Sequence, residues 1–357
     1  MGGRVFQIVR HLAYGDGVCE IARGFVPLLA GRSGGGSILA ETADPRLRHE
    51  AGPLAEVDWR PDDLAVVHVA GATGLTEFVA RCPARKALFF HNITPPELLR
   101  PGTRIHGECR QGWEELPFIA ARADLWLAVS AFNLEQLATR TGLSRPGFVV
   151  PPVIDLSVER AREPDSVRLH ALRAGGRRNI LFVGRIAPSK RQAELMEVFD
   201  RLWAMLPDTR LHLVGGATDN ELYLLALARL RAGLAAGHAV EMPGKVSDAE
   251  LVAYYRAADL FVCLSAHEGF CLPPLIAAAH GVPVLARAAA AIPETVGPAA
   301  LLFDEDDPVR IAALAAAVLE DARIRSDLVA AAGQHLRRFA PEHVGKAWER
   351  ALAAVGQ

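Results

Sequence analysis

The sequence predicts an α/β fold of two successive open domains, each built on a doubly wound parallel sheet. The chain has 357 residues, which suits two domains at roughly 150 residues each. Short apolar runs alternate with amphipathic stretches, a pattern typical of βαβ units whose strands are buried on both faces. A polar, arginine-rich stretch at 157–179 interrupts this alternation and therefore indicates a boundary.

The first domain is expected over residues 1–155, followed by a linker at 156–178. Its strands are expected in the apolar runs 4–13, 37–41, 64–71, 86–93, 124–130 and 148–152. Helical patterns follow the first run at 15–31 and the fifth run at 131–142. This order predicts a Rossmann-like sheet with crossover helices.

The second domain is expected over residues 179–340. Its strands are expected at 180–186, 210–216, 239–244, 260–265, 283–287 and 300–303, with helices at 189–206, 221–233, 247–259 and 272–281. A further helical pattern lies at 341–355. Because ligands of such sheets bind beyond the carboxyl ends of the strands, the facing strand ends of the two domains are expected to line a cleft that holds the site.

Composition narrows the classes of function. Hydrophobic residues make up 51% and charged residues 22%, as in globular proteins, and the net charge of −2 argues against a nucleic-acid binder. Scattered cysteines without a CxxC pair argue against a disulfide framework or a zinc site and favour a cytoplasmic setting. The first apolar run is too short for a signal peptide. No run reaches the ~18 residues of a membrane span, which leaves peripheral membrane contact open.

Two stretches of the second domain have the chemistry of an anion site. In VGRIAPSK, Arg185 follows a strand and Lys190 opens the next helix, where cations and free amides suit a diphosphate. The alternative is an ordinary loop with solvated charges. In HEGFCLPPLI, Glu268 could accept hydrogen bonds from hydroxyls, and the amides of Phe270, Cys271 and Leu272 could meet an anion. Alternatively, Glu268 caps the helix.

These stretches together resemble the GT-B glycosyltransferases of family 4. The matching segments are FVGRIAPSK, LHLVGG, GKVSDAELVAYYRAADLFVCLSAHEGFCLPPL, HGVPVLA and IPETVGPAALLF, with HNITPPELL and ADLWLAVSAFN in the first half. The resemblance implies a metal-independent, retaining hexosyltransferase of GT-B fold with two Rossmann-like domains, which uses a nucleoside-diphosphate sugar and no cofactor. It also implies that the segment 341–357, with Trp348, crosses back to the first domain.

The resemblance implies a role for each matched residue of the second half. Arg185 and Lys190, beside Gly184, would hold the diphosphate and stabilise the leaving group. Glu268 and the Gly269–Leu272 backbone would hold the sugar and phosphates. Residues lining the base would be Lys245, Val246, Ile292 and Pro293.

One position departs from the family pattern. The family's second glutamate, which binds the ribose hydroxyls, corresponds to Ile276 here. A carboxylate–hydroxyl hydrogen bond contributes about 1.5–3 kcal/mol, so its loss should weaken or alter donor binding without abolishing transfer. The rival interpretations are a non-catalytic sugar-nucleotide-binding relative and a sugar-nucleotide epimerase of the same fold.

The first half supplies weaker candidates. Gly15, Asp16 and Gly17 form a loop after the first strand that resembles the family's phosphate-approaching loop, although Asp16 could equally be a helix N-cap. The resemblance gives His91 a contact near the reacting carbon, often through its backbone carbonyl. Acceptor-side candidates at neighbouring strand ends are Asn92, Ser130 and Asn133.

Two other patterns are interpreted structurally, and several properties stay open. FDEDDP at 303–308 is expected to cap a helix rather than to bind a metal, and GRSGGGS at 31–37 lacks the lysine of a P-loop. No metal site is expected. The resemblance favours GDP-mannose over UDP- and dTDP-sugars, with a glycan, a lipid-linked intermediate or a small natural product as acceptor. The oligomeric state is not indicated.

Overall fold

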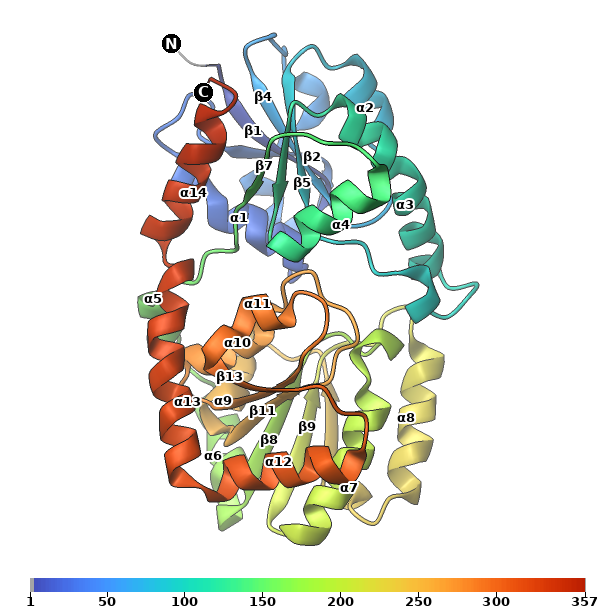
Figure 1. Ribbon diagram of the computed structural model, residues 1–357, viewed down its shortest axis with the longest axis vertical. Helices are drawn as coiled ribbons and strands as arrows, with labels where there is room; N and C mark the ends of the chain where they lie inside the picture. Colours follow the sequence, from blue (N-terminus) through green and yellow to red (C-terminus); the bar gives the residue numbers. More distant parts are fainter. Residues whose placement is uncertain (1–2, 357) are drawn as a thin grey trace. The chain divides into compact units, whose positions relative to one another are not determined.

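The computed structural model describes residues 3–356, and the chain divides into two compact units (Figure 1). Unit 1 comprises Met1–Pro96, Arg104–Ile154 and Arg338–Gln357, and unit 2 comprises Glu97–Thr103 and Asp155–Arg337. The segment that contains Trp348 thus groups with the first half of the chain. Among the described residues, no helix combines the length and the apolar character that crossing a membrane would need.

Unit 1 is built on a parallel sheet. Within residues 3–356 it has seven strands in the order β3-β2-β1-β4-β5-β6-β7. The strands are β1 (Val5–Leu12), β2 (Ser37–Ala43), β3 (Ala51–Pro53), β4 (Leu64–Val69), β5 (Arg85–Phe90), β6 (Leu125–Ala128) and β7 (Gly147–Val149). The order reverses between β1 and β4, which makes the sheet doubly wound. Every residue of β4 is buried, as a strand covered on both faces requires.

Helices cover both faces of this sheet. They are α1 (Gly17–Leu29), α2 (Thr76–Arg81), α3 (Arg104–Arg122), α4 (Ala131–Thr141) and α14 (Pro341–Ala353). Figure 1 shows α1 and α14 on one side of the strands and α2, α3 and α4 on the other, in line with the contacts of α1 with α14 and of α3 with α2 and α4. The Trp348 ring of α14 packs on Phe25 of α1, with ring centroids 5.2 Å apart, and on Phe89. Aromatic burial therefore anchors α14 in unit 1.

Unit 2 repeats the same winding. Its six parallel strands have the order β10-β9-β8-β11-β12-β13 within residues 3–356. They are β8 (Arg178–Val183), β9 (Thr209–Val214), β10 (Val240–Gly244), β11 (Leu260–Cys263), β12 (Val284–Arg287) and β13 (Ala300–Phe303). Here the order reverses between β8 and β11, so the loops after these two strands open side by side.

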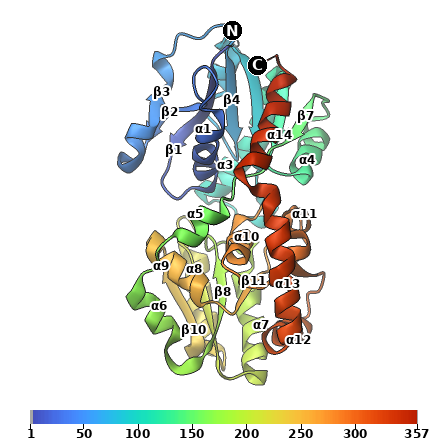
Figure 2. The same cartoon turned by 90° about the vertical axis from the view of Figure 1, so that its left-hand side faces the viewer.

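The helices of unit 2 lie in two layers. They are α5 (Leu156–Ala161), α6 (Ser166–Arg173), α7 (Gln192–Met205), α8 (Glu221–Gly233), α9 (Asp248–Ala257), α10 (Leu272–Ala279), α11 (Ile292–Val296), α12 (Pro308–Glu320) and α13 (Ala322–His335). Figure 2 shows α6 and α9 on one side of the strands and α7 and α12 on the other, and each of these pairs is in contact. The predicted α/β class with two parallel sheets is confirmed.

Residues 156–178, expected as a linker, instead hold α5 and α6 and group with unit 2. Asp155 and Asp165 cap the two helices through their side chains. Leu172 is buried, and α6 packs on α9. The charged residues that suggested a boundary lie on the solvent-facing sides of these short helices. Each helix is too short for its buried apolar residues to show the 3.6-residue spacing of an amphipathic helix.

Candidate functional site

The strongest candidate site lies at the reversal point of the unit 2 sheet. β8 and β11 pair directly, and their loops carry Arg185, Lys190 and Glu268. The backbone N–H of Ala266 donates to the carbonyl of Ser189 at 2.9 Å, which ties the two loops together. The sequence-predicted charged residues of this half are therefore brought to the edge where open α/β sheets bind ligands.

Lys190 and Glu268 form a tight ion pair. Lys190 Nζ lies 2.5 Å from Glu268 Oε1, and only 19% and 14% of their side chains are exposed. Burial acts to lower the pKa of Lys190, but the charge of Glu268 outweighs it and leaves that pKa above its ordinary value. The site thus holds an ammonium next to a carboxylate, and Glu268 serves as an ion-pair partner.

Arg185 presents a second cation at this edge. Its side chain is exposed, and within residues 3–356 its guanidinium makes no hydrogen bond or ion pair. The backbone around it is held firmly: its carbonyl accepts from Gln192 Nε2 at 2.9 Å, and Ile186 N–H donates to Gly216. A fixed backbone with an available guanidinium suits recognition of an anion such as phosphate.

Glycines let three loops approach each other at the same edge. A Cβ on Gly215, which follows β9, would lie 1.9 Å from the carbonyl oxygen of Gly184, which follows β8. Gly215 N–H donates to the carbonyl of Gly244 at the end of β10. Only glycine fits at position 215. The segment LHLVGG gave the signal for Gly215, although the residue was not singled out from the sequence.

The segment HEGFC turns sharply into α10. Cys271 has left-handed backbone angles, φ 70° and ψ 69°, immediately before Leu272, and Pro273 lies in the first turn. This confirms the predicted helix start near Leu272–Pro273. The carbonyl of Glu268 accepts from Ala291 N–H at 3.2 Å, so the loop is also tied to the residue before α11. Gly269 and Phe270 complete the turn.

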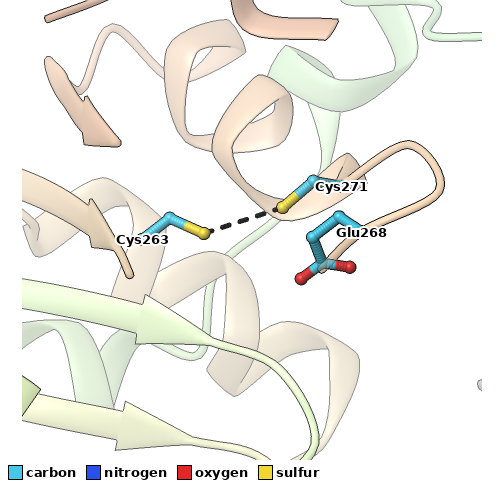
Figure 3. Close-up of side chains that lie close together, drawn as sticks. All are labelled: Cys263, Glu268 and Cys271. Atoms are coloured by element: carbon cyan, nitrogen blue, oxygen red, sulfur yellow. Dashed lines mark hydrogen bonds between the residues drawn. The ribbon is translucent and has the colours of Figure 1, made fainter. Parts of the chain in front are cut away.

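Two buried thiols lie beside the ion pair. Cys263 Sγ at the end of β11 is 3.8 Å from Cys271 Sγ, and the Glu268 carboxylate lies next to both (Figure 3). Sequence reasoning named Cys271 but gave Cys263 no role in the site. The eight-residue separation gives no motif, and only the turn at Cys271 brings the two sulfurs together.

The residues expected around a nucleotide base differ from one another in their exposure. Lys245 is exposed and Val246 half-buried directly after β10, next to the glycine loops. Ile292, by contrast, is fully buried at the start of α11, because its side chain faces the core. Its side chain therefore offers no surface to a ligand, and only its backbone could do so. Ile276 is half-buried on α10, one turn after Leu272.

In unit 1, the loop after β1 contains the predicted Gly15, Asp16 and Gly17, all exposed. Asp16 Oδ1 accepts from the amides of Val18 and Cys19 at 3.0 and 3.1 Å. Asp16 is therefore the N-cap of α1, one of the two alternatives that the sequence left open.

His91 lies just after β5, but its ring belongs to a buried stack. Its Nε2 is 2.7 Å from His68 Nδ1, and the ring stacks on Phe89 with centroids 4.7 Å apart. Burial, with the neighbouring His68, lowers the pKa of His91 well below its ordinary value. The imidazole is therefore neutral and only 9% exposed, which leaves the backbone carbonyl as the contact that the resemblance implies.

The acceptor-side candidates hold the local fold together. Ser130 Oγ accepts from Asn133 N–H as the N-cap of α4, and Asn133 Oδ1 accepts from Asn92 Nδ2 at 2.8 Å. All three residues are buried, Ser130 and Asn133 almost completely. Ser130 thus caps α4 with its hydroxyl, and the Asn133 side chain bonds to Asn92, so a contact of either residue with an acceptor stays a prediction.

Comparison with known proteins is consistent with this architecture. The chain is 34% identical over 245 residues to a D-inositol 3-phosphate glycosyltransferase of Geodermatophilus obscurus, which covers 66% of this chain and 52% of that protein. It is 29% identical to a GDP-mannose-dependent alpha-(1-6)-phosphatidylinositol monomannoside mannosyltransferase of Mycolicibacterium smegmatis, over 70% of this chain and 71% of that protein. The chain spans about half the length of the first of these relatives.

Solved structures show the same fold over nearly the whole chain. The structure of Anabaena Alr3699/HepE in complex with UDP and glucose has a TM-score of 0.77 at 16% identity, covering 98% of this chain and 99% of that one. Sucrose-phosphate synthase from Thermosynechococcus elongatus has a TM-score of 0.73 at 18% identity, covering 99% and 100%. Residues 170–335 match the family described as Glycosyl transferases group 1. The chain therefore has the GT-B glycosyltransferase fold, and its residues 170–335 are a domain of the glycosyl transferases group 1 family.

Proposed function

We propose that this protein is a retaining, metal-independent glycosyltransferase of family 4, which transfers a hexosyl unit from a nucleoside-diphosphate sugar to an acceptor hydroxyl. The observation that carries the proposal is the set of charges at the β8–β11 edge. An available guanidinium lies on the same strand-end loop as an ammonium that is paired with a carboxylate. This arrangement provides cations for a diphosphate and an acceptor for sugar hydroxyls.

In the proposed reaction, negative charge develops on the diphosphate as the bond to the anomeric carbon breaks. Arg185 and Lys190 stabilise that charge, and the ion pair with Glu268 already holds Lys190 in place, which limits the reorganisation needed during the step. Glu268 keeps Lys190 in place and accepts hydrogen bonds from the sugar. The acceptor hydroxyl attacks from the face that the diphosphate leaves, and a phosphate oxygen takes the hydroxyl proton.

For the donor, we propose a GDP-sugar, with GDP-mannose first. The relative from M. smegmatis is named as GDP-mannose-dependent, whereas the Anabaena structure was solved with UDP. Ile276 replaces the carboxylate that the family uses for the ribose, so UDP- and dTDP-sugars are the donors to compare with it. The names of the relatives favour an acceptor of the inositol-phosphate or phosphatidylinositol type.

The experiment is a thermal-stability titration of the purified protein with GDP, UDP, dTDP, ADP and CMP. A ligand at about 100 times its Kd adds roughly 2.7 kcal/mol to the folded state. We expect one diphosphate, GDP first, to raise the Tm clearly more than CMP does. A folded sample that none of these nucleotides stabilises would contradict donor binding and favour a non-catalytic relative of the same fold.

A further inference from the structure

The thiol pair beside the ion pair has no part in the proposed transfer. Cys263 and Cys271 are both buried, and their sulfurs lie 3.8 Å apart. One atom each from Cys263, Glu268 and Cys271 lie within 4.8 Å of one another. Figure 3 shows the two sulfurs pointing toward each other, with the carboxylate beside them. The cluster thus combines two soft ligands and one hard ligand.

The sulfur separation matches a tetrahedral metal centre. With a Zn–S bond of about 2.3 Å, two thiolates on one tetrahedral zinc lie about 3.8 Å apart. A thiolate and a carboxylate oxygen on the same ion lie about 3.5 Å apart, given a Zn–O bond of about 2.0 Å. The sulfurs therefore need no displacement, and the Glu268 carboxylate needs a short one.

The charges around the cluster also fit a divalent cation. Two thiolates and the Glu268 carboxylate carry three negative charges, and Lys190 supplies one positive charge. The remaining two negative charges balance a dication in a buried setting, where unbalanced charge is costly. Ser265 Oγ lies 3.5 Å from Cys263 Sγ, and its hydroxyl can donate to the thiolate once that proton has left.

We propose that Cys263, Cys271 and Glu268 form a binding site for a thiophilic divalent cation of the Zn²⁺ class. Binding releases the two thiol protons to solvent, forms two metal–sulfur bonds and one metal–oxygen bond, and leaves one position for water. The Glu268 carboxylate moves from Lys190 to the cation. The site requires no change in oxidation state.

Occupancy of this site would alter the sugar-binding edge. Glu268 bound to the cation is no longer available to Lys190 or to a sugar hydroxyl, so the cation inhibits donor use. This consequence rests on the proposed function, whereas cation binding itself does not. Failure of the transferase assignment therefore leaves the binding measurement unchanged, and the two failures can be told apart.

The test uses the full chain, freed of metal and kept reduced with a phosphine. Cd²⁺ is titrated while its sulfur-to-metal charge-transfer absorption is followed, and Zn²⁺ affinity is measured by competition with a chromogenic chelator. We expect one cation per chain, and at least ~10-fold weaker binding for Cys263→Ala and Cys271→Ala. Cys82→Ala is the matched control, because Cys82 is also buried but lies in unit 1; it should bind as the wild type does.

Two further variants test the role of the ion pair. Glu268→Gln should keep the sulfur absorption but weaken Zn²⁺ binding. Lys190→Met should strengthen Zn²⁺ binding, because the Glu268 carboxylate then has no ion pair to break before it binds the cation. If the unmodified protein gives no sulfur-to-cadmium absorption, or if Cys82→Ala removes it, the proposal is overturned. If the affinity for Zn²⁺ is unchanged in both Glu268→Gln and Lys190→Met, Glu268 is not a ligand of the cation.

Discussion

At the scale of single residues, the arrangement of charge at the β8–β11 edge is the feature that matters most. Lys190 and Glu268 are largely buried and satisfy each other, whereas Arg185 is exposed and has no partner within residues 3–356. Breaking a buried pair leaves an uncompensated charge, so the two members hold each other in place. Arg185 can move toward an incoming anion, while Lys190 is already fixed.

Replacing either cation should reduce turnover. We expect Arg185→Ala and Lys190→Ala each to lower kcat roughly 100- to 1,000-fold, because each removes a group that stabilises developing charge. The measurement is the initial rate of nucleoside diphosphate release at saturating acceptor. Arg201→Ala, an exposed arginine on α7, is the control and should act like the wild type. Near-normal rates in Arg185→Ala and Lys190→Ala would contradict the proposal that these two residues stabilise the leaving diphosphate.

Ile276 offers the opposite kind of test, a gain of binding. We expect Ile276→Glu to tighten binding of the preferred nucleoside diphosphate by about 10- to 150-fold, since a charged hydrogen bond contributes about 1.5–3 kcal/mol. Calorimetry with GDP and with its 2′,3′-dideoxy analogue checks this, because only the ribose form should gain. Ile276→Leu provides a control without new charge. Equal gains for both nucleotides would show that the ribose lies elsewhere.

The buried histidine pair should make stability depend on pH. Burial lowers the pKa of His68 from 6.5 to about 3, so the folded protein binds fewer protons than the unfolded chain below pH 6.5. The contribution of the two neutral rings to the free energy of unfolding is therefore fully present above pH 6.5. It falls as the pH drops toward 3, by up to about 1.4 kcal/mol per pH unit for each ring.

Thermal unfolding at pH 7 and pH 5 measures this effect. His68→Gln, which keeps a polar partner for His91, should reduce the loss of Tm between the two pH values. His49→Gln removes an exposed histidine of the same unit and should leave that loss unchanged. A wild-type Tm that is independent of pH over this range would contradict a neutral buried pair.

At the scale of secondary-structure elements, capping residues decide where several helices begin. Asp307 Oδ1 accepts from Val309 N–H at the start of α12, in the acidic segment that had suggested either a cap or a metal ligand. The structure gives Asp307 the capping role that the sequence predicted. Its neighbour Asp306 bridges Arg287 and Arg191 at 2.6 and 2.9 Å, so this acidic segment ties the start of α12 to the end of β12 and to the start of α7.

Removing this cap should weaken α12 without affecting catalysis. Asp307→Ala is expected to lower the free energy of unfolding by about 0.5–2 kcal/mol, the usual contribution of an N-cap. Asp304→Ala, in the same segment and exposed, is the control and should change little. Denaturant titration of both variants measures the difference. Activity lost in Asp307→Ala and restored by added Mg²⁺ would contradict the capping role.

The elements also show how far the sequence could be interpreted. The strand runs and the start of α10 were predictable because buried parallel strands and a proline in the first turn leave local signals. The Lys190–Glu268 pair was not, because its members are 78 residues apart and meet only through the pairing of β8 with β11. The sequence offered Asn92 and Asn133 as acceptor-side candidates but could not show that a hydrogen bond joins their two buried side chains.

At the scale of the whole molecule, the chain returns to its first unit at the end. Trp348 of α14 is almost fully buried against Phe25 and Phe89. We expect Trp348→Ala to lower the stability of unit 1 by about 3–5 kcal/mol, the usual effect of truncating a buried aromatic ring. Differential scanning calorimetry should then show an earlier transition for unit 1.

Unit 2 provides the internal reference for this prediction. Nucleotide-induced stabilisation should persist in Trp348→Ala, because Arg185, Lys190 and Glu268, the charged residues proposed to bind the donor, lie in unit 2. Arg350→Ala on the exposed side of the same helix should leave both transitions in place. Loss of nucleotide binding together with the unit 1 transition would show that the two units fold as one.

The backbone N–H of Ile154 donates to the carbonyl of Phe339 at 2.7 Å. These residues flank the long stretch 155–337, so the chain leaves unit 1 and re-enters it at neighbouring points. The stretch 155–337 is thus arranged as an insert with adjoining ends in a host, unit 1, and only Glu97–Thr103 of unit 2 lies outside that insert. The stretch that matches the glycosyl transferases group 1 family lies wholly inside the insert. Exchange of this stretch at the junction would therefore replace the whole matched domain in one continuous piece while keeping the host.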